Sequence, residues 1–212
     1  MSDWLLVRLA RDGSQPTGWV TVSSSGQLLD VQGATDAQGL AAAAVGKRVA
    51  LVVPGADVLH LAAVLPSGSE SKLAQIVPYA LEEQVAEDLD GLHFAVGRPV
   101  DGPGSPTSVD VVSRALLERW LGVAADHGFS PVAVHADSAL VPQVPGQLTV
   151  LLDDETLILR SGTQRPLVLP VSDPAFALDL AFPGDADARR GQRRQCAGAH
   201  GAAADADPCR GA

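Results

Sequence analysis

Short apolar runs bounded by turn residues recur through the first third of the chain and predict β-strands. The runs that we predict as strands are residues 4–9, 19–23, 28–31, 50–53 and 58–65. The first three are joined by short polar turns containing glycine, as expected for an antiparallel meander. Asp36 is a suitable N-cap for a short helix that extends to Ala44. The N-terminal region therefore predicts a meander, a helix and further strands.

A helical period follows, with Ser69 as its predicted N-cap. Its apolar positions recur every three or four residues and are Leu73, Ile76, Val77, Ala80, Leu81, Val85 and Leu89. Pro78 predicts a kink in this helix or a restart at that residue. The other face carries Glu82, Glu83, Glu87 and Asp88. On a helix, Glu83 and Glu87 would repel each other, and no basic residue follows nearby. We interpret this acidic face either as a solvated surface or as a binding site for a cationic protein partner.

The second half of the chain repeats the mixture of strands and helices. The predicted strands are residues 92–100, 109–114, 132–134, 148–152, 156–160 and 167–169. A helix opens at Ser113 or Arg114 and ends at His127-Gly128, a sequence suited to a helix C-terminus. Asp137 and Ser138 can cap another short helix. Two meanders separated by helix-bearing segments predict a duplicated α/β architecture.

Composition narrows the class of protein. The 212 residues are 46% hydrophobic with a net charge of −10, which argues against nucleic acid or an anionic membrane as the main partner. No apolar run approaches the roughly 20 residues that span a bilayer, and the N-terminus has no secretory signal pattern. Both cysteines, Cys196 and Cys209, lie near the C-terminus, which suits a folded part made in a reducing cytoplasm.

The chain changes character near Phe182. Residues 183–212 contain no branched aliphatic or aromatic residue, so they cannot bury enough apolar area to offset the entropy of ordering. We predict one folded unit over residues 1–182 and a low-complexity, disordered tail over residues 183–212. The tail is alternatively the out-of-frame end of a longer reading frame.

The usual catalytic and cofactor motifs do not appear. Gly46-Lys47-Arg48 lacks the spacing and the hydroxyl of a phosphate-binding loop, and no Gly-x-Ser-x-Gly nucleophile motif is present. His135, Asp137 and Ser138 are better explained by a capped turn than by a catalytic triad. Cys196, His200 and Cys209 are potential metal ligands only within the low-complexity tail. We therefore predict no catalytic residue, no cofactor and no metal.

One segment resembles a known family. The run from Pro78 to Phe94, Pro-Tyr-Ala-Leu-Glu-Glu-Gln-Val-Ala-Glu-Asp-Leu-Asp-Gly-Leu-His-Phe, is similar to the cytoplasmic domain of the type II secretion system protein L family, GspL. The Trp-Leu-Leu-Val-Arg-Leu run at residues 4–9, Leu65-Pro66, Gly128-Phe129-Ser130-Pro131 and the Asp-Ser-Ala-Leu run at 137–140 fit the same pattern. The resemblance covers residues 3–182.

The resemblance implies an α/β actin-like ATPase (ribonuclease H-like) fold, with mixed sheets, flanking helices and two or more subdomains. It implies a non-enzymatic scaffold on the cytoplasmic face of the inner membrane. Its partners would be the N-terminal domain of the secretion ATPase GspE and protein M of the same platform, with a possible homodimer and no nucleic acid. Family members continue through more of the actin-like domain, a transmembrane helix and a periplasmic domain. This sequence carries no such helix, and we expect a soluble cytoplasmic chain.

Nucleotide binding is the main alternative that the resemblance raises, as in actin-like proteins of pilus assembly or cell division. Active members of that superfamily use two phosphate-binding hairpins rich in glycine, since backbone amides must approach the phosphates closely. Here the corresponding turns are residues 11–16 and Asp153-Asp154-Glu155. The second turn has three acids and no glycine, so we predict that nucleotide binding is absent or vestigial. A small hydrolase is a third interpretation, disfavoured because no nucleophile site is evident.

Overall fold

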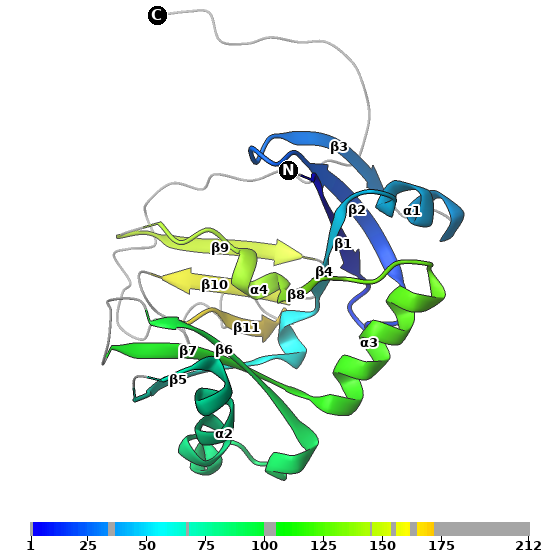
Figure 1. The fold of residues 1–212 in the computed structure, drawn as a ribbon. Coiled ribbons are helices and arrows are strands. Elements are labelled where there is room, and N and C mark those ends of the chain that lie inside the picture. Colours follow the sequence, from blue (N-terminus) through cyan, green and yellow to red (C-terminus); the bar gives the residue numbers. More distant parts are fainter. Residues whose placement is uncertain are drawn as a thin grey trace, which may run out of the picture.

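The computed structural model describes residues 2–33, 37–66, 68–99, 105–144, 146–153, 156–161 and 165–171. This part of the chain forms three β-sheets with helices packed against them (Figure 1). The order of elements is mixed α/β, as the sequence predicts. The N-cap predicted at Asp36 and the predicted tail over residues 183–212 lie outside the described residues.

Sheet A contains both parallel and antiparallel pairs. Its order is β3 (Leu28–Gly33), β2 (Pro16–Val22), β1 (Trp4–Leu9), β4 (Arg48–Val53) and β8 (Ala133–Ala136). The meander β1–β2–β3 is antiparallel, whereas β4 runs parallel to both β1 and β8. Strand β4 is buried on both faces after its first residue, which accounts for its unbroken apolar sequence.

Helix α3 (Arg114–Asp126) covers one face of sheet A (Figure 1). Trp120, only 1% exposed, packs among Leu5, Val7 and Leu51 in the largest core cluster. Its indole also closes the β1–β2 turn, because a Cβ on Gly13 would lie 2.2 Å from Trp120 Nε1. Gly13 has φ +66°, a conformation that glycine adopts without steric cost. The α1 helix (Ala37–Ala44) contributes the buried Leu40 to the same core.

Sheet B is an antiparallel sheet with the order β5 (Leu59–Val64), β7 (Pro106–Ser113) and β6 (Leu92–Pro99). The α2 helix (Glu70–Ala80) packs against it. Val77 and Leu81 are completely buried there beside Leu61, Val109 and Val111. Sheet B and α2 therefore form a second core, separate from that of sheet A, and lie at the opposite end of the molecule from β3 (Figure 1).

Sheet C is the second meander predicted from the sequence. Its antiparallel strands are β11 (Leu167–Pro170), β10 (Thr156–Ser161) and β9 (Leu148–Asp153), in that order. The short α4 helix (Asp137–Leu140) precedes it, and Arg160 of β10 donates to the carbonyls of Ala139 and Val141. A turn of 3-10 helix, η1 (Gly55–Asp57), lies between sheets A and B. The sequence placed these strands within a few residues of their observed bounds.

Two predictions about helix ends differ from the structure. The helix predicted to reach Leu89 stops at Ala80, and its acidic residues follow it in turns. The N-cap position of α4 is Ala136, and no side chain makes a capping hydrogen bond there, so Asp137 and Ser138 do not cap this helix. Both of those side chains instead contact other elements, as described below. The end predicted for α3 is confirmed, with His127 as its C-cap and Gly128 at φ +77°.

Candidate partner-binding site

The acidic segment follows α2 and is the strongest site candidate from the sequence. Ser69 caps α2 as predicted, because its side chain accepts a hydrogen bond from the Lys72 amide. Pro78 lies inside the helix, and Leu81 ends it with its amide shared between the carbonyls of Val77 and Pro78. The helix that was predicted to kink or restart at Pro78 instead ends shortly after it, at Ala80, with Leu81 as its C-cap.

Electrostatics explains why this helix does not continue. The last turn of α2 contains no basic residue, and the next residues are Glu82 and Glu83. Carboxylates near the negative end of a helix are unfavourable, and Pro78 has already removed one helical hydrogen bond. The chain turns into η2 (Glu82–Gln84), extends at Val85, and forms η3 (Leu89–Gly91). The predicted helical repulsion between Glu83 and Glu87 is therefore wrong, since the two residues are not on one helix.

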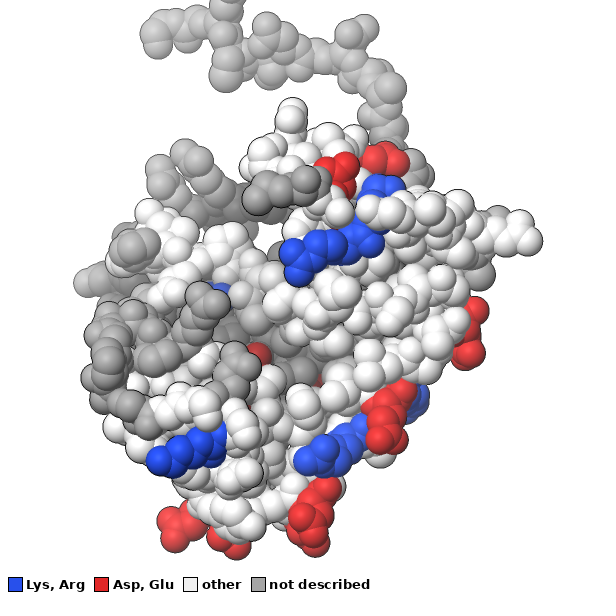
Figure 2. All heavy atoms as spheres, viewed as in Figure 1, with Lys and Arg blue, Asp and Glu red and all other residues white. Residues whose placement is uncertain are grey.

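The resulting surface, which we call the acidic corner, brings carboxylates and one aromatic residue to the same open cavity. It is lined by Ala74, Gln75, Pro78, Tyr79, Glu82, Glu87, Asp88, Leu89, Asp90 and Arg114, which enclose an open cavity of about 790 Å³. Glu83 is exposed nearby but does not line the cavity. Figure 2 shows Asp and Glu side chains at the end of the molecule that carries α2 in Figure 1. Three of the four predicted acids, Glu82, Glu87 and Asp88, are thus brought together.

Tyr79 is the residue that the sequence reasoning missed. It is the only tyrosine of the chain and its side chain is 74% exposed. Its position off the buried stripe of α2 could have revealed it, because a large aromatic on a polar helix face has no packing role there. Exposed tyrosines are enriched among the residues that dominate protein–protein binding.

The acids of the corner are unneutralised. Within the described residues, no ion pair joins Glu82, Glu83 or Glu87 to a cation. Asp88 accepts a hydrogen bond from the amide of Asp90 and so caps η3. Arg114 is the nearest basic residue on the lining, and its Nε donates to the Asp90 carbonyl at 3.1 Å. The corner therefore presents a negative potential that favours a cationic partner.

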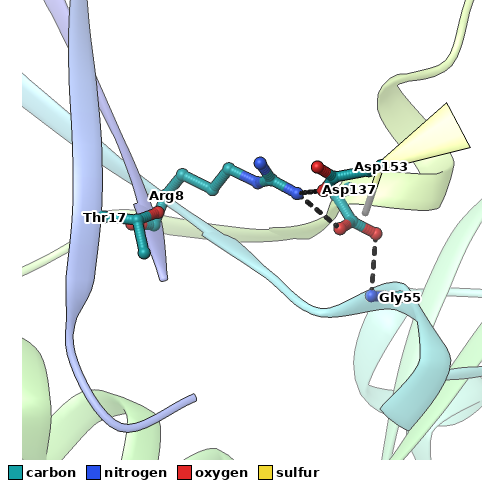
Figure 3. A network of polar contacts seen from close by, with 5 residues as sticks. All are labelled: Arg8, Thr17, Gly55, Asp137 and Asp153. Atoms are coloured by element: carbon teal, nitrogen blue, oxygen red, sulfur yellow. Dashed lines mark hydrogen bonds and ion pairs between the residues drawn. The ribbon is translucent and has the colours of Figure 1, made fainter. Parts of the chain in front are cut away.

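A second cluster of charges lies between the two meanders (Figure 3). Arg8 at the end of β1 pairs with Asp153 at the end of β9, and lies 3.7 Å from the Asp137 carboxylate. Asp137 also accepts a hydrogen bond from the Gly55 amide at 2.8 Å. Side chains and backbone from β1, η1, α4 and β9 therefore meet at one point, although Arg8 and Asp153 are 145 residues apart.

This cluster lies between the two turns that correspond to the phosphate-binding hairpins of actin-like proteins. The cavity beside Arg8, Gly55, Asp137 and Asp153 measures only about 30 Å³, against several hundred for a typical small-molecule site. In the first turn, the Ser14 hydroxyl donates to Asp12 at 2.6 Å and lowers the pKa of that carboxyl. Asp12 thus serves to close its own turn. Asp154 and Glu155 of the second turn lie outside the described residues.

A network of three polar side chains, His60, Asp110 and Ser138, joins sheet B to α4. His60 Nδ1 lies 2.7 Å from Asp110 Oδ1, and His60 Nε2 lies 2.7 Å from Ser138 Oγ. The order of atoms is that of a Ser-His-Asp triad, which the sequence did not reveal because 78 residues separate His60 from Ser138. Ser138 is completely buried against Gly55, however, so a substrate has no access to its hydroxyl. This group joins structural elements and does not provide a nucleophile. His135, considered with Ser138 from the sequence, is exposed.

Comparison with known proteins identifies the family. The model of the family described as "Type II secretion system (T2SS), protein L" matches residues 5–184. This chain belongs to the protein L family of the type II secretion system. It is 29% identical to protein L of Pectobacterium carotovorum subsp. carotovorum over 183 residues, and 33% identical to that of Dickeya chrysanthemi over 142 residues. These matches cover 84% and 66% of this chain, but only 42% and 35% of the two relatives.

A solved structure agrees with the fold. The cytoplasmic domain of EpsL, an inner membrane component of the type II secretion system of Vibrio cholerae, superposes with a TM-score of 0.65 at 20% identity. The match covers 90% of this chain and 79% of that domain. The predicted actin-like α/β fold is confirmed. In the described part of this protein L chain, no helix is long and apolar enough to cross a membrane.

Proposed function

We propose that this protein L chain is a non-enzymatic scaffold that recruits the secretion ATPase GspE to the inner-membrane platform through its acidic corner. The observation that carries the proposal is an exposed tyrosine, Tyr79, that lines the same open cavity as Glu82 and Glu87, two carboxylates with no ion pair within the described residues. Such a surface offers an exposed aromatic anchor and a charge pattern that steers a cationic domain. Protein M of the same platform is a further proposed partner, and we place the complex on the cytoplasmic face of the membrane.

Charge reversal tests the electrostatic part of the proposal. Glu83→Lys with Glu87→Lys should weaken binding of the GspE N-terminal domain by about tenfold or more at low salt, and by less as ionic strength rises. The measurement is isothermal titration of the purified GspE domain into each variant. Glu118→Lys with Asp126→Lys is the matched control, because both residues are exposed on α3 and the net charge rises by the same four units, from −10 to −6.

Tyr79→Ala separates the anchor from the charge. An aromatic hot spot contributes about 2 kcal/mol, so this variant should bind the GspE domain roughly 30-fold more weakly at every salt concentration. Equal affinity of wild type, the double lysine variant and Tyr79→Ala would show that GspE binds elsewhere on the molecule. Circular dichroism of each variant verifies that the fold is intact.

The alternative of a nucleotide-binding protein has a direct test. We expect titration with MgATP to give no saturable heat, because Arg8, Asp137 and Asp153 fill the space between the meander turns. Saturable micromolar binding would favour the actin-like nucleotide-binding function instead.

A further inference from the structure

A basic side chain lines the acidic corner without neutralising it. Arg114 begins α3, and its Nε donates to the Asp90 carbonyl at 3.1 Å, which tethers the guanidinium to η3 at the wall of the cavity. Within the described residues, its other nitrogens make no ion pair with Glu82 or Glu87 and no further hydrogen bond. The corner thus combines unpaired carboxylates with an exposed guanidinium whose Nη1–Nη2 edge is open.

The stability of α3 does not account for a cation at this position. The N-terminal end of a helix carries a positive partial charge, which disfavours Arg there, and the first turn of α3 contains no acidic residue that would compensate. The bond to the Asp90 carbonyl uses one of the five donors of the side chain. Arg114 therefore keeps a charge and a pair of donors that the helix does not need, which is typical of a residue with a role in binding.

The open edge of a guanidinium is suited to a carboxylate. Its two parallel N–H groups match the two oxygens of Asp or Glu, and such charge-assisted pairs are stronger than neutral hydrogen bonds. Because the Nε bond already restricts Arg114, less side-chain entropy remains to be lost on binding. A partner segment with basic residues alone would gain from Glu82 and Glu87 but would be repelled by Arg114.

We propose that Arg114 sets the specificity of the acidic corner by binding a carboxylate of the partner. The partner segment is then of mixed charge: an Asp or Glu contacts Arg114, and Lys or Arg residues beside it contact Glu82 and Glu87. Repulsion by Arg114 disfavours segments that are uniformly basic. This inference rests on the proposed function, because it concerns how the corner distinguishes GspE from other cationic proteins.

The first test depends on the sign of an effect. Arg114→Gln makes the corner more negative by one charge, so a uniformly basic partner would bind the variant several-fold more tightly. If the partner supplies a carboxylate to Arg114, the variant should instead bind the N-terminal domain of GspE about tenfold more weakly. Isothermal titration at low salt measures the affinity. Stronger or unchanged binding overturns the proposal.

Arg119→Gln is the matched control. Arg119 is also exposed on α3 and also donates to a backbone carbonyl at 3.1 Å, that of Asp12, but it does not line the corner. The variant removes the same charge from the same helix and should not weaken binding. Circular dichroism and urea denaturation verify that both variants fold. Equal weakening by Arg119→Gln would assign the effect to the charge of α3 as a whole and overturns the proposal.

A charge swap separates contact with the partner from the tether to η3. Arg114→Glu loses the bond to the Asp90 carbonyl and should bind about 100-fold more weakly, since two carboxylates would face each other. Each Asp and Glu of the GspE domain is then replaced in turn by Arg. One replacement should raise the affinity for Arg114→Glu about tenfold and lower the affinity for the wild-type chain. A role in the turn alone gives no such rescue, and its absence from every partner variant overturns the proposal.

Failure of this inference and failure of the proposed function give different results. If Tyr79→Ala weakens binding as expected while Arg114→Gln strengthens it, the corner binds GspE but Arg114 does not bind a carboxylate. If Tyr79→Ala and the double lysine variant both retain full affinity, GspE binds elsewhere, and the proposed role of Arg114 is wrong together with the proposed site.

Discussion

The molecule contains two groups of carboxylates that differ in how they are held. In the cluster between the meanders, Asp137 and Asp153 pair with Arg8, and Asp137 also accepts the Gly55 amide. Glu82 and Glu87 of the acidic corner, and Glu83 beside it, have no ion pair within the described residues. The first group connects elements that are distant in sequence, whereas the second lies on turns that follow a helix end. Partnered acids thus stabilise the fold, and unpartnered acids are available for recognition.

The largest expected effect on stability comes from disturbing the cluster of Arg8, Asp137 and Asp153. A Cβ on Gly55 would lie 2.2 Å from Ser138 Oγ and 2.6 Å from Asp137 Oδ1, so Gly55→Ala must displace both side chains. Overpacking together with a broken charged hydrogen bond should cost about 3 kcal/mol in the free energy of unfolding. Urea denaturation followed by circular dichroism measures this value.

Gly122→Ala is the control for that variant. A Cβ on Gly122 meets nothing within 4 Å and lies inside α3, so alanine there should stabilise the protein by roughly 0.5–1 kcal/mol. If both glycine variants changed stability alike, the contacts of Gly55 with Asp137 and Ser138 would have no special role.

A smaller, pH-dependent effect concerns His93 in β6. Burial lowers the pKa of His93, and the nearby Arg114 lowers it further. The unfolded chain therefore binds a proton more readily, and His93 costs stability as pH falls below about 6.5. We expect His93→Gln to lose less stability than the wild type between neutral and mildly acidic pH. Urea denaturation at the two pH values checks this, and an identical pH dependence of the two proteins would contradict it. Because its pKa is lowered, His93 is neutral at pH 7 and adds no positive charge near the acidic corner.

The smallest expected effect on stability comes from removing the unpaired charges in and beside the acidic corner. Glu83→Gln with Glu87→Gln should change the free energy of unfolding by no more than about 0.5 kcal/mol, because these side chains are exposed and have no partner to lose. Thermal and urea denaturation measure it. A large loss of stability would mean that the corner supports the fold, and the contrast between the two groups would fail.

The sequence predicted most of the elements because their patterns are local. The meanders follow from short apolar runs separated by polar turns, and α3 follows from its apolar stripe and its His127-Gly128 end. The end of α2 was missed because Val85 and Leu89 continue the helical spacing, while the unfavourable carboxylates and Pro78 stop the helix. The contacts of Arg8 and His60 depend on partners 50 to 145 residues away, which a local pattern does not contain. Tyr79 lies off the predicted apolar stripe of α2, so the sequence did contain a signal for its exposure.

The order in which the chain visits its sheets has a consequence for folding during synthesis. Sheet B and α2 come from one continuous stretch, residues 59–113, so most of their contacts form between near neighbours. Sheet A instead is complete only after β8 at residues 133–136 has been synthesised, and the ion pair of Arg8 forms only after Asp153 has been synthesised. Because local contacts close faster than distant ones, sheet B should assemble while the ribosome still holds β8, which pairs with β4, and Asp153, which pairs with Arg8. Sheet A, although its first four strands are made before sheet B, would then be completed after it.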